Sequence, residues 1–214
     1  MKEQKILSEY DSKNILREAG VLVCKEILAK DLTEVRKAIA EIGYPVVLKP
    51  SLPGLAHKSE HKVVFLDVKS DQEAENAYNI IKDKFPEAKI LVQEMVNNQR
   101  EVVVGFIRDR IMGPCVMFGL GGIFTEILRD ITFRLAPVNF KEAMMMLQDI
   151  KGKKILESVR SLVEVDKNAL ADIIVKVSNI GANNNHIKEI DINPICFNEQ
   201  GTPIVVDCSV ILNN

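Results

Sequence analysis

The spacing of hydrophobic and polar residues along this 214-residue chain changes repeatedly between a helical and an extended period. Apolar residues three and four positions apart predict helices over 8–19, 33–42, 70–84, 140–149 and 166–180. Apolar or alternating runs predict strands over 46–49, 63–68, 90–94, 101–107, 115–118, 132–136, 189–194 and 203–207. The first half therefore runs helix, helix, strand, strand, helix, strand. Because helices and strands do not alternate regularly, the pattern predicts an α+β fold and argues against a doubly wound parallel sheet.

The first predicted helix opens at Ser8, with Asp11 in a capping-box-like position, and ends at Gly20. Its apolar stripe consists of Leu7, Ile15, Leu16 and Ala19. We expect this stripe to form the helix's buried face.

A polar segment, Asn97–Gln99, interrupts the pattern between two strands and marks the expected boundary between two α+β lobes. The sequence thus predicts a smaller lobe with the N-terminal helix over residues 1–96 and a larger lobe over residues 97–214. A ligand site is expected in the cleft between the lobes, where such sites commonly lie. Residues 51–62 lack regular periodicity, which predicts a loop.

Composition excludes several classes of protein. The chain is 47% hydrophobic, enough for a sizeable core, and its 28 Lys and Arg nearly balance 30 Asp and Glu. The net charge of -2 argues against a nucleic-acid binder or a basic membrane-surface protein. Its apolar runs are too short to cross a bilayer, and its charged N-terminus lacks the apolar core of a secretory signal. We therefore expect a cytoplasmic protein without a membrane span.

The cysteines form no C-x-x-C pair and stand among apolar neighbours at positions 24, 115, 196 and 208. This placement indicates buried, reduced thiols rather than disulfides or a zinc site.

Hard oxygen ligands occupy one face of a predicted strand near the C-terminus. Successive side chains of a strand point to opposite faces, so Glu189, Asp191 and Asn193 share a face that the intervening isoleucines do not. Pro194 is expected to end this strand or place it at a sheet edge, and a turn then returns Asp207 alongside. Carboxylate and amide oxygens suit Mg²⁺. An ordinary half-exposed hairpin would give the same alternation, so spacing alone leaves both interpretations open.

Lys49 ends an apolar strand, where a charged side chain needs a partner such as a phosphate, although a strand-end lysine can also extend to water. Glu94 and Met95 end another strand, and Glu101 begins the next. A connection of this kind can offer backbone groups to an adenine edge and carboxylates to ribose hydroxyls, but surface turns often look the same.

Three glycines fall within four residues at Gly119–Gly122, which permits close backbone approach and positive φ angles. No Gly-Lys-Ser/Thr follows, and the glycine spacing does not match the dinucleotide fingerprint. The segment could line a substrate channel, with a plain tight turn as the default.

His57 and His61 stand four residues apart in the predicted loop. Metal binding there is not expected, because a third ligand is not evident in the sequence. His57 could act as a nucleophile toward a phosphoryl group, or it could be a hydrated loop histidine.

Several ordered segments resemble the β subunit of ADP-forming acetyl-CoA synthetases. These are NDP-forming acyl-CoA ligases with an ATP-grasp fold, related to succinyl-CoA synthetase. The matching segments cover essentially the whole chain and include 7–10, 42–49, 57–59, 91–95, 100–105, 113–114, 117–124 and 189–194.

The resemblance implies that ATP is made reversibly from ADP and phosphate at the expense of an acyl-CoA thioester. It implies ATP/ADP and Mg²⁺ as cofactors, and a CoA-binding α subunit as partner in an α2β2 heterotetramer. By position, Lys49 would contact nucleotide phosphates, Glu94 and Met95 the adenine, and Glu101 the ribose side of the pocket. Asn193 and Asp207 would hold Mg²⁺, and His57 would relay the phosphoryl group.

The chain departs from this family at 60–64, where Glu-His-Lys-Val-Val replaces Asp-Val-Gly-Gly-Val. The lost glycines would let a hairpin lie over the phosphates, whereas Lys62 and Val63 resist positive φ. Two hypotheses follow: an active β subunit, and a noncatalytic or regulatory ATP-grasp partner with weakened nucleotide binding.

Overall fold

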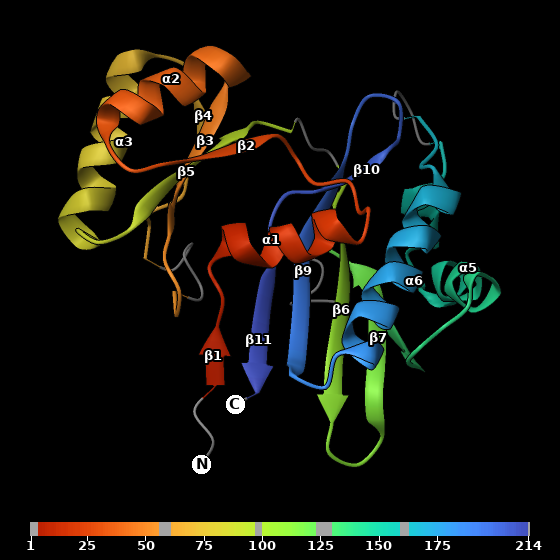
Figure 1. Ribbon diagram of the computed structural model, residues 1–214. Helices are drawn as coiled ribbons and strands as arrows, with labels where there is room; N and C mark the ends of the chain where they lie inside the picture. The colour runs from red at the N-terminus through yellow and green to blue at the C-terminus, as the bar shows by residue number, and fades with distance from the viewer. Residues whose placement is uncertain (1–3, 56–60, 97–99, 123–129, 159–162, 214) are drawn as a thin grey trace. The chain divides into compact units, whose positions relative to one another are not determined.

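The computed structural model describes five stretches of the chain: residues 4–55, 61–96, 100–122, 130–158 and 163–213. Within the chain, two compact units form (Figure 1). Unit 1 comprises residues 1–5, 12–23 and 96–214, and unit 2 comprises residues 6–11 and 24–95.

Both units combine helices with strands, as the pattern predicts. The helices are α1 (Glu9–Glu18), α2 (Leu32–Ile42), α3 (Asp71–Lys84), α5 (Phe140–Asp149) and α6 (Lys167–Asn183), with a short 3-10 helix η1 (Lys153–Leu156). The strands are β1 (Gln4–Ile6), β2 (Glu26–Ala29), β3 (Val46–Ser51), β4 (Phe65–Val68), β5 (Lys89–Glu94), β6 (Val102–Asp109), β7 (Gly113–Leu120), β8 (Ile131–Leu135), β9 (Ile187–Phe197), β10 (Pro203–Val205) and β11 (Ser209–Asn213).

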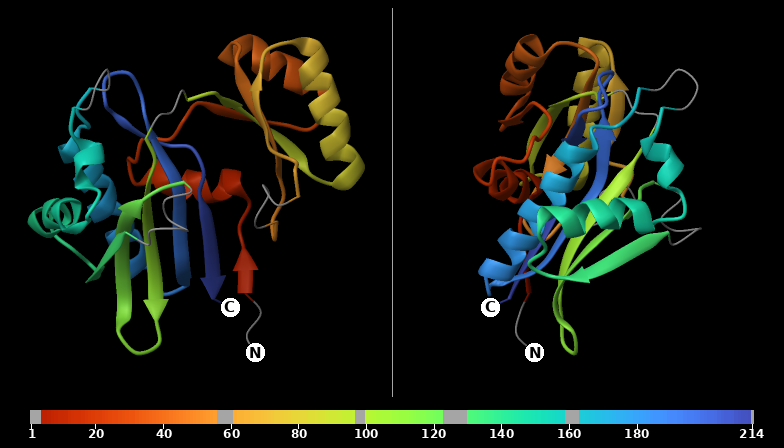
Figure 2. Two further views of the ribbon diagram at one scale, coloured as in Figure 1. Left: turned by 180° about the vertical axis from the view of Figure 1, so that it is seen from behind. Right: turned by 90° about the vertical axis from the view of Figure 1, so that its right-hand side faces the viewer.

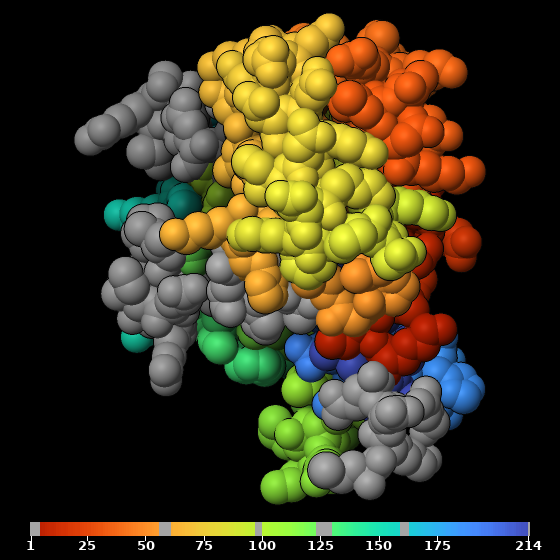
Figure 3. Space-filling model, turned by 90° about the vertical axis from the view of Figure 1, so that its left-hand side faces the viewer, coloured from red at the N-terminus to blue at the C-terminus, as the bar shows by residue number. Residues whose placement is uncertain are grey.

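Unit 2 contains a four-stranded sheet in the order β2-β5-β3-β4, with each neighbouring pair antiparallel. Helices α2 and α3 pack on this sheet and against each other. Helix α3, drawn yellow in Figure 3, exposes mostly polar residues together with Ile80, whereas its alanines and Ile81 are buried. Strand β2 is absent from the predicted order of elements, because four residues without flanking turn residues give little signal.

Unit 1 contains a larger sheet in the order β1-β11-β9-β6-β7-β8, with β10 also paired to β9. Helix α6 packs on β6, β7 and β9, and α5 packs on β7 and β8 beside α6. Both helices thus cover the same face of the sheet (Figure 2). Burial of apolar side chains between these two layers supplies the unit's main stabilisation.

Side-chain caps set the starts of most of these helices. The Ser70 hydroxyl accepts a hydrogen bond from the Glu73 N–H, as its position predicts. Asn139 and Glu142 form a reciprocal capping box at α5. The carboxylate of Asp166 accepts two N–H bonds from the first turn of α6. Capping residues therefore define helix starts that periodicity alone leaves approximate.

The buried face of α1 differs from the predicted apolar stripe. Leu16 is buried, but Ile15 and Ala19 are only partly buried. The fully buried positions with helical spacing are instead Glu9, Ser12, Lys13 and Leu16. The prediction was wrong here because these polar groups find partners inside the fold; for example, the Ser12 hydroxyl accepts from the Val210 N–H at 3.1 Å.

Two local expectations about backbone are also corrected. Strand β9 does not end at Pro194 but runs through it to Phe197, with β6 on one side and β10 and β11 on the other. A register shift on the β6 side, between Val102 and Val104, accommodates the proline, which has no N–H to give. Lys62 adopts φ 54°, so the chain keeps a left-handed turn where glycine was expected to be required.

All four cysteines are buried and are thiols rather than members of disulfides, as predicted. Burial raises the pKa of the Cys115 thiol, which disfavours its thiolate. Among the residues that the structure describes, no helix is long and apolar enough to cross a membrane.

Candidate functional site

The predicted oxygen-bearing face of β9 exists in the structure. Ile190 and Ile192 are buried, whereas Glu189 and Asp191 are partly buried and Asn193 is exposed. The turn after β9 is closed by Asn198, whose side-chain oxygen accepts from the N–H groups of Gln200 and Thr202. This turn brings the following residues back along β9.

Asp207 lies opposite Asn193 in the sheet register. Two opposed pairs define this register: Val205 with Ile195, and Ser209 with Asp191. Two residues after Val205 is Asp207, and two residues before its partner Ile195 is Asn193. Counting from Ser209 and Asp191 in the opposite direction gives the same two residues. The Val206 N–H donates to the Pro194 carbonyl at 3.3 Å, which joins the segments between the two ladders. The sheet therefore brings together two residues that stand fourteen positions apart.

This pair suits a magnesium ion in its chemistry. It offers one carboxylate and one amide oxygen, and Mg²⁺ commonly takes one or two protein ligands and completes its shell with water and phosphate oxygens. Within the described stretches, no group of three or more His, Cys, Asp or Glu side chains is placed so that it could hold a metal ion. The residues fit an ion that is shared with a phosphate.

The glycine-rich turn packs directly against Glu101. The Gly121 N–H donates to the Glu101 carbonyl at 2.8 Å. A β-carbon at Gly121 would lie 2.7 Å from the Glu101 carbonyl carbon, and one at Gly122 would lie 2.3 Å from its carboxylate oxygen Oε2. Gly122 also has φ +62°. These glycines therefore let the turn approach the backbone and carboxylate of Glu101, which is the close approach that the glycine spacing predicts.

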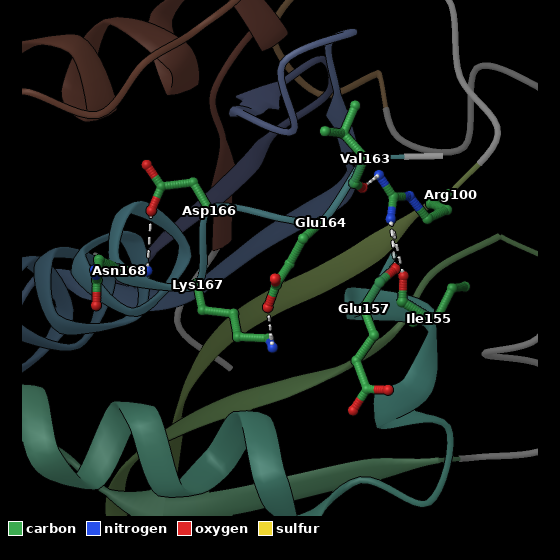
Figure 4. Close-up of polar contacts among 8 residues, drawn as sticks. All are labelled: Arg100, Ile155, Glu157, Val163, Glu164, Asp166, Lys167 and Asn168. Atoms are coloured by element: carbon green, nitrogen blue, oxygen red, sulfur yellow. Dashed lines mark hydrogen bonds and ion pairs between the residues drawn. The ribbon is translucent and has the colours of Figure 1, made fainter. Parts of the chain in front are cut away.

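Arg100, next to Glu101, is a buried anchor (Figure 4). Its guanidinium donates to the carbonyls of Ile155, Glu157 and Val163 at 3.2, 3.3 and 2.6 Å. It also lies 5.6 Å from the centre of the Phe197 ring. Burial lowers the pKa of Arg100. The guanidinium thus ties the start of β6 to the segment that leads into α6.

Lys49 is buried on β3 in unit 2. Its ammonium donates to the Glu9 carboxylate at 2.8 Å, and the two side chains are 5% and 1% exposed. Contrary to the prediction from the sequence, the strand does not end at Lys49 but continues to Ser51, and the lysine side chain does not extend to water. Lys49 lies in a strand that is buried throughout. Its charged partner, Glu9, comes from helix α1, forty residues earlier.

Glu94 and Met95 are held at the end of β5 by main-chain bonds. The Glu94 carboxylate accepts from the Lys25 N–H at 2.7 Å, and the Glu94 N–H donates to the Lys25 carbonyl at 2.9 Å. The Met95 N–H donates to the Pro45 carbonyl at 3.3 Å. These bonds fix the backbone of this short segment at the end of β5.

His57 lies outside the described residues. His61, four positions on, is described: its ring meets Phe85 edge-on at 5.8 Å between centres, and its carbonyl accepts from the Lys84 ammonium. His61 thus has a packing role.

Sequence reasoning missed Glu9 and Arg100. The capping-box-like positions of Ser8 and Asp11 predict an exposed helix start, so they do not predict a buried Glu9. The sequence signal for Glu9 is the helical spacing of Glu9, Ser12 and Lys13, which marks a polar stripe beside Leu16. For Arg100, whose carbonyl acceptors lie more than fifty residues away, the sequence contains no comparable signal.

The fold and these residues define the class of protein. The ATP-grasp domain family matches residues 1–212, and the chain belongs to this family. The expected ATP-grasp fold is thereby confirmed.

Individual relatives narrow the class of protein within this family. The chain is 42% identical to ADP-forming acetate–CoA ligase I subunit beta of Pyrococcus furiosus, over 98% of this chain and 93% of that protein. Its structure matches Ca. Korarchaeum cryptofilum dinucleotide forming acetyl-coenzyme A synthetase 1 in complex with coenzyme A and Ca-AMPCP. The TM-score is 0.90 at 36% identity, over 98% of this chain and 94% of that chain. The predicted resemblance to β subunits of ADP-forming acyl-CoA ligases is thus confirmed.

Proposed function

We propose that this chain is the nucleotide-binding β subunit of an ADP-forming acyl-CoA ligase. With a CoA-binding α subunit, it interconverts acyl-CoA, ADP and phosphate with carboxylic acid, CoA and ATP. The proposed assembly is an α2β2 heterotetramer in the cytoplasm. The extent of the similarity to the Pyrococcus furiosus beta subunit supports this assignment.

Lys49 would contact the phosphates, the Glu94–Met95 segment the adenine, and Glu101 the ribose. Asn193 and Asp207 would hold Mg²⁺, which offsets phosphate charge when bound. The single observation that carries the proposal is the register that sets Asp207 opposite Asn193.

His57 is proposed to carry the phosphoryl group. A nitrogen of its imidazole forms a bond to phosphorus as the bond to the donor on the α subunit breaks. A terminal oxygen of ADP then attacks phosphorus, so that ATP forms and the imidazole is released. A related Korarchaeum structure with Mg-AMPPCP has a phosphohistidine segment pointing towards its nucleotide binding site, at 35% identity and TM-score 0.82, over 96% of this chain and 93% of that chain.

The acid substrate is proposed to be selected outside this chain. The chain is 37% identical, over 91% of its length, to part of a 4-hydroxybutyrate–CoA ligase of Nitrosopumilus maritimus. Relatives named for different acids are therefore similar to this chain to a comparable degree.

A noncatalytic partner subunit is the alternative, and the altered residues 60–64 are its motivation. The left-handed φ of Lys62 supports the active subunit instead, because the turn survives without its glycine. In the alternative, nucleotide would bind weakly and the complex would not turn over.

The test mixes the purified chain with a CoA-binding α subunit, acetyl-CoA, phosphate and MgADP. ATP formation, followed by a luciferase assay, is expected only when both subunits are present. Calorimetry of the complex with MgADP and MgATP is expected to show binding. Absence of heat at millimolar nucleotide would overturn the proposal, whereas binding without turnover would favour the noncatalytic alternative.

Replacing Gly122 by alanine is expected to raise the KM for ADP by about fivefold. The new β-carbon would collide with the Glu101 carboxylate, which is the movable end of a flexible side chain, so the carboxylate should shift while the fold persists. The KM for acetyl-CoA should stay unchanged.

Gly113→Ala is the matched control for this substitution. Gly113 has φ +85°, so alanine there suffers the same backbone strain, but its β-carbon would meet nothing within 4 Å. An equal rise in KM for ADP in both variants would assign the effect to backbone strain rather than to Glu101.

A further inference from the structure

The buried pair of Glu9 and Lys49 joins a helix to the strand that carries the proposed phosphate contact. The carboxylate oxygen Oε1 and the ammonium Nζ are 2.8 Å apart, a normal length for a charge-assisted hydrogen bond. Both side chains are almost entirely removed from solvent. Water therefore solvates neither charge well, and the two charges stabilise each other directly.

Burial makes the carboxylate important for the lysine. Lysine has a flexible four-carbon stem and a strongly hydrated ammonium, so an unpaired ammonium would move toward water. Removing one member of a buried ion pair leaves the other uncompensated, which costs far more than loss of a surface pair. Glu9 therefore helps to hold the ammonium of Lys49 in its buried position.

The carboxylate has two opposite influences on an anionic ligand. It lowers the positive potential at Lys49, which weakens attraction to phosphate, and it holds the ammonium in place, which strengthens binding. In a fully buried strand the second influence is larger, because an ammonium that has turned toward solvent contributes nothing to a phosphate site.

We propose that Glu9 is a positioning residue that holds the Lys49 ammonium for the nucleotide phosphates. This inference rests on the proposed function, and it adds helix α1 to the groups that shape nucleotide binding. It also explains why α1 has a polar rather than an apolar buried face at Glu9.

The test compares the nucleotide affinities of the unaltered protein with those of Glu9→Gln, whose side chain has the same size but no charge. By calorimetry on the complex with the α subunit, its Kd for MgADP is expected to rise about tenfold, and its Kd for adenosine, which has no phosphate, less than about twofold. In a Lys49→Met background, adding Glu9→Gln should change the Kd for MgADP by less than about twofold, since the two residues act as one unit. Glu18→Gln, an exposed carboxylate on the same helix, should match the unaltered protein.

The outcomes separate the two proposals. If Lys49→Met leaves MgADP binding unchanged, the proposed phosphate contact is wrong. If Lys49→Met weakens binding but Glu9→Gln does not, only the positioning role is wrong. Equal losses for adenosine and MgADP in Glu9→Gln would indicate a merely structural role and overturn the inference.

Glu9→Asp keeps the test decisive if Glu9→Gln does not fold. This variant retains the charge but shortens the side chain by one methylene. It is expected to fold and to raise the Kd for MgADP by about threefold. An unchanged Kd for MgADP would contradict the positioning role.

Discussion

Replacement of His57 by alanine is expected to lower ATP formation by at least about a thousandfold, because alanine cannot form the bond to phosphorus that the proposed relay requires. The Kd for MgADP should change by less than about twofold, since the imidazole acts on the transferred group and not on the resting nucleotide. Luciferase detection of ATP and calorimetry with MgADP measure the two effects separately.

A labelling experiment provides a second measure of the relay. The complex is incubated with acetyl-CoA and ³²P-labelled phosphate without ADP, and acid-labile label on the β subunit is counted. Label should appear on the unaltered chain and be absent from His57→Ala. His61→Ala is the matched control, because its ring packs on Phe85 and should not affect labelling. Undiminished turnover of His57→Ala would rule out the relay role.

Substitution of Asp207 by asparagine is expected to lower the rate of ATP formation about a hundredfold at a fixed, low Mg²⁺ concentration. Asn193 offers a neutral oxygen, so Asp207 supplies the negative charge of this pair and with it much of the attraction for the ion. The Mg²⁺ concentration for half-maximal rate should rise, and excess Mg²⁺ should restore part of the activity. The measurement is a rate titration with Mg²⁺ at saturating ADP.

The opposite charge change tests the same pair. Asn193→Asp adds a carboxylate opposite Asp207 and should lower the Mg²⁺ concentration for half-maximal rate. Glu199→Gln removes an exposed carboxylate from the nearby turn and serves as control. A titration curve for Asp207→Asn that matches the unaltered protein would remove this residue from the metal site.

Local pattern was sufficient wherever short-range chemistry decides the structure. The capped start of α3 at Ser70 and the alternation along β9 both follow from neighbours within a few residues. The glycines at Gly121–Gly122 were likewise recognisable, because only a residue without a β-carbon fits so close to another backbone. Such features depend on residues that are close in sequence.

Local pattern failed where a distant partner overrides local preference. A proline usually ends or edges a strand, but β9 continues through Pro194 because a register shift against β6 absorbs the missing N–H. Lys62 takes a left-handed φ that its side chain disfavours. In helix α1, buried polar groups at Glu9 and Lys13 replace the expected apolar stripe.

Periodicity, turn residues and motifs were enough to predict most elements, the α+β class, the resemblance to ADP-forming acyl-CoA ligase β subunits and the residue types of the proposed magnesium site. The folded chain was needed to establish that Asp207 lies opposite Asn193, that Arg100 anchors the segment before α6 and that Lys49 contacts Glu9. The difference lies in the sequence separation of the interacting groups. Periodicity and capping act over a few residues, whereas register and buried charge pairs depend on groups that folding brings together from far along the chain.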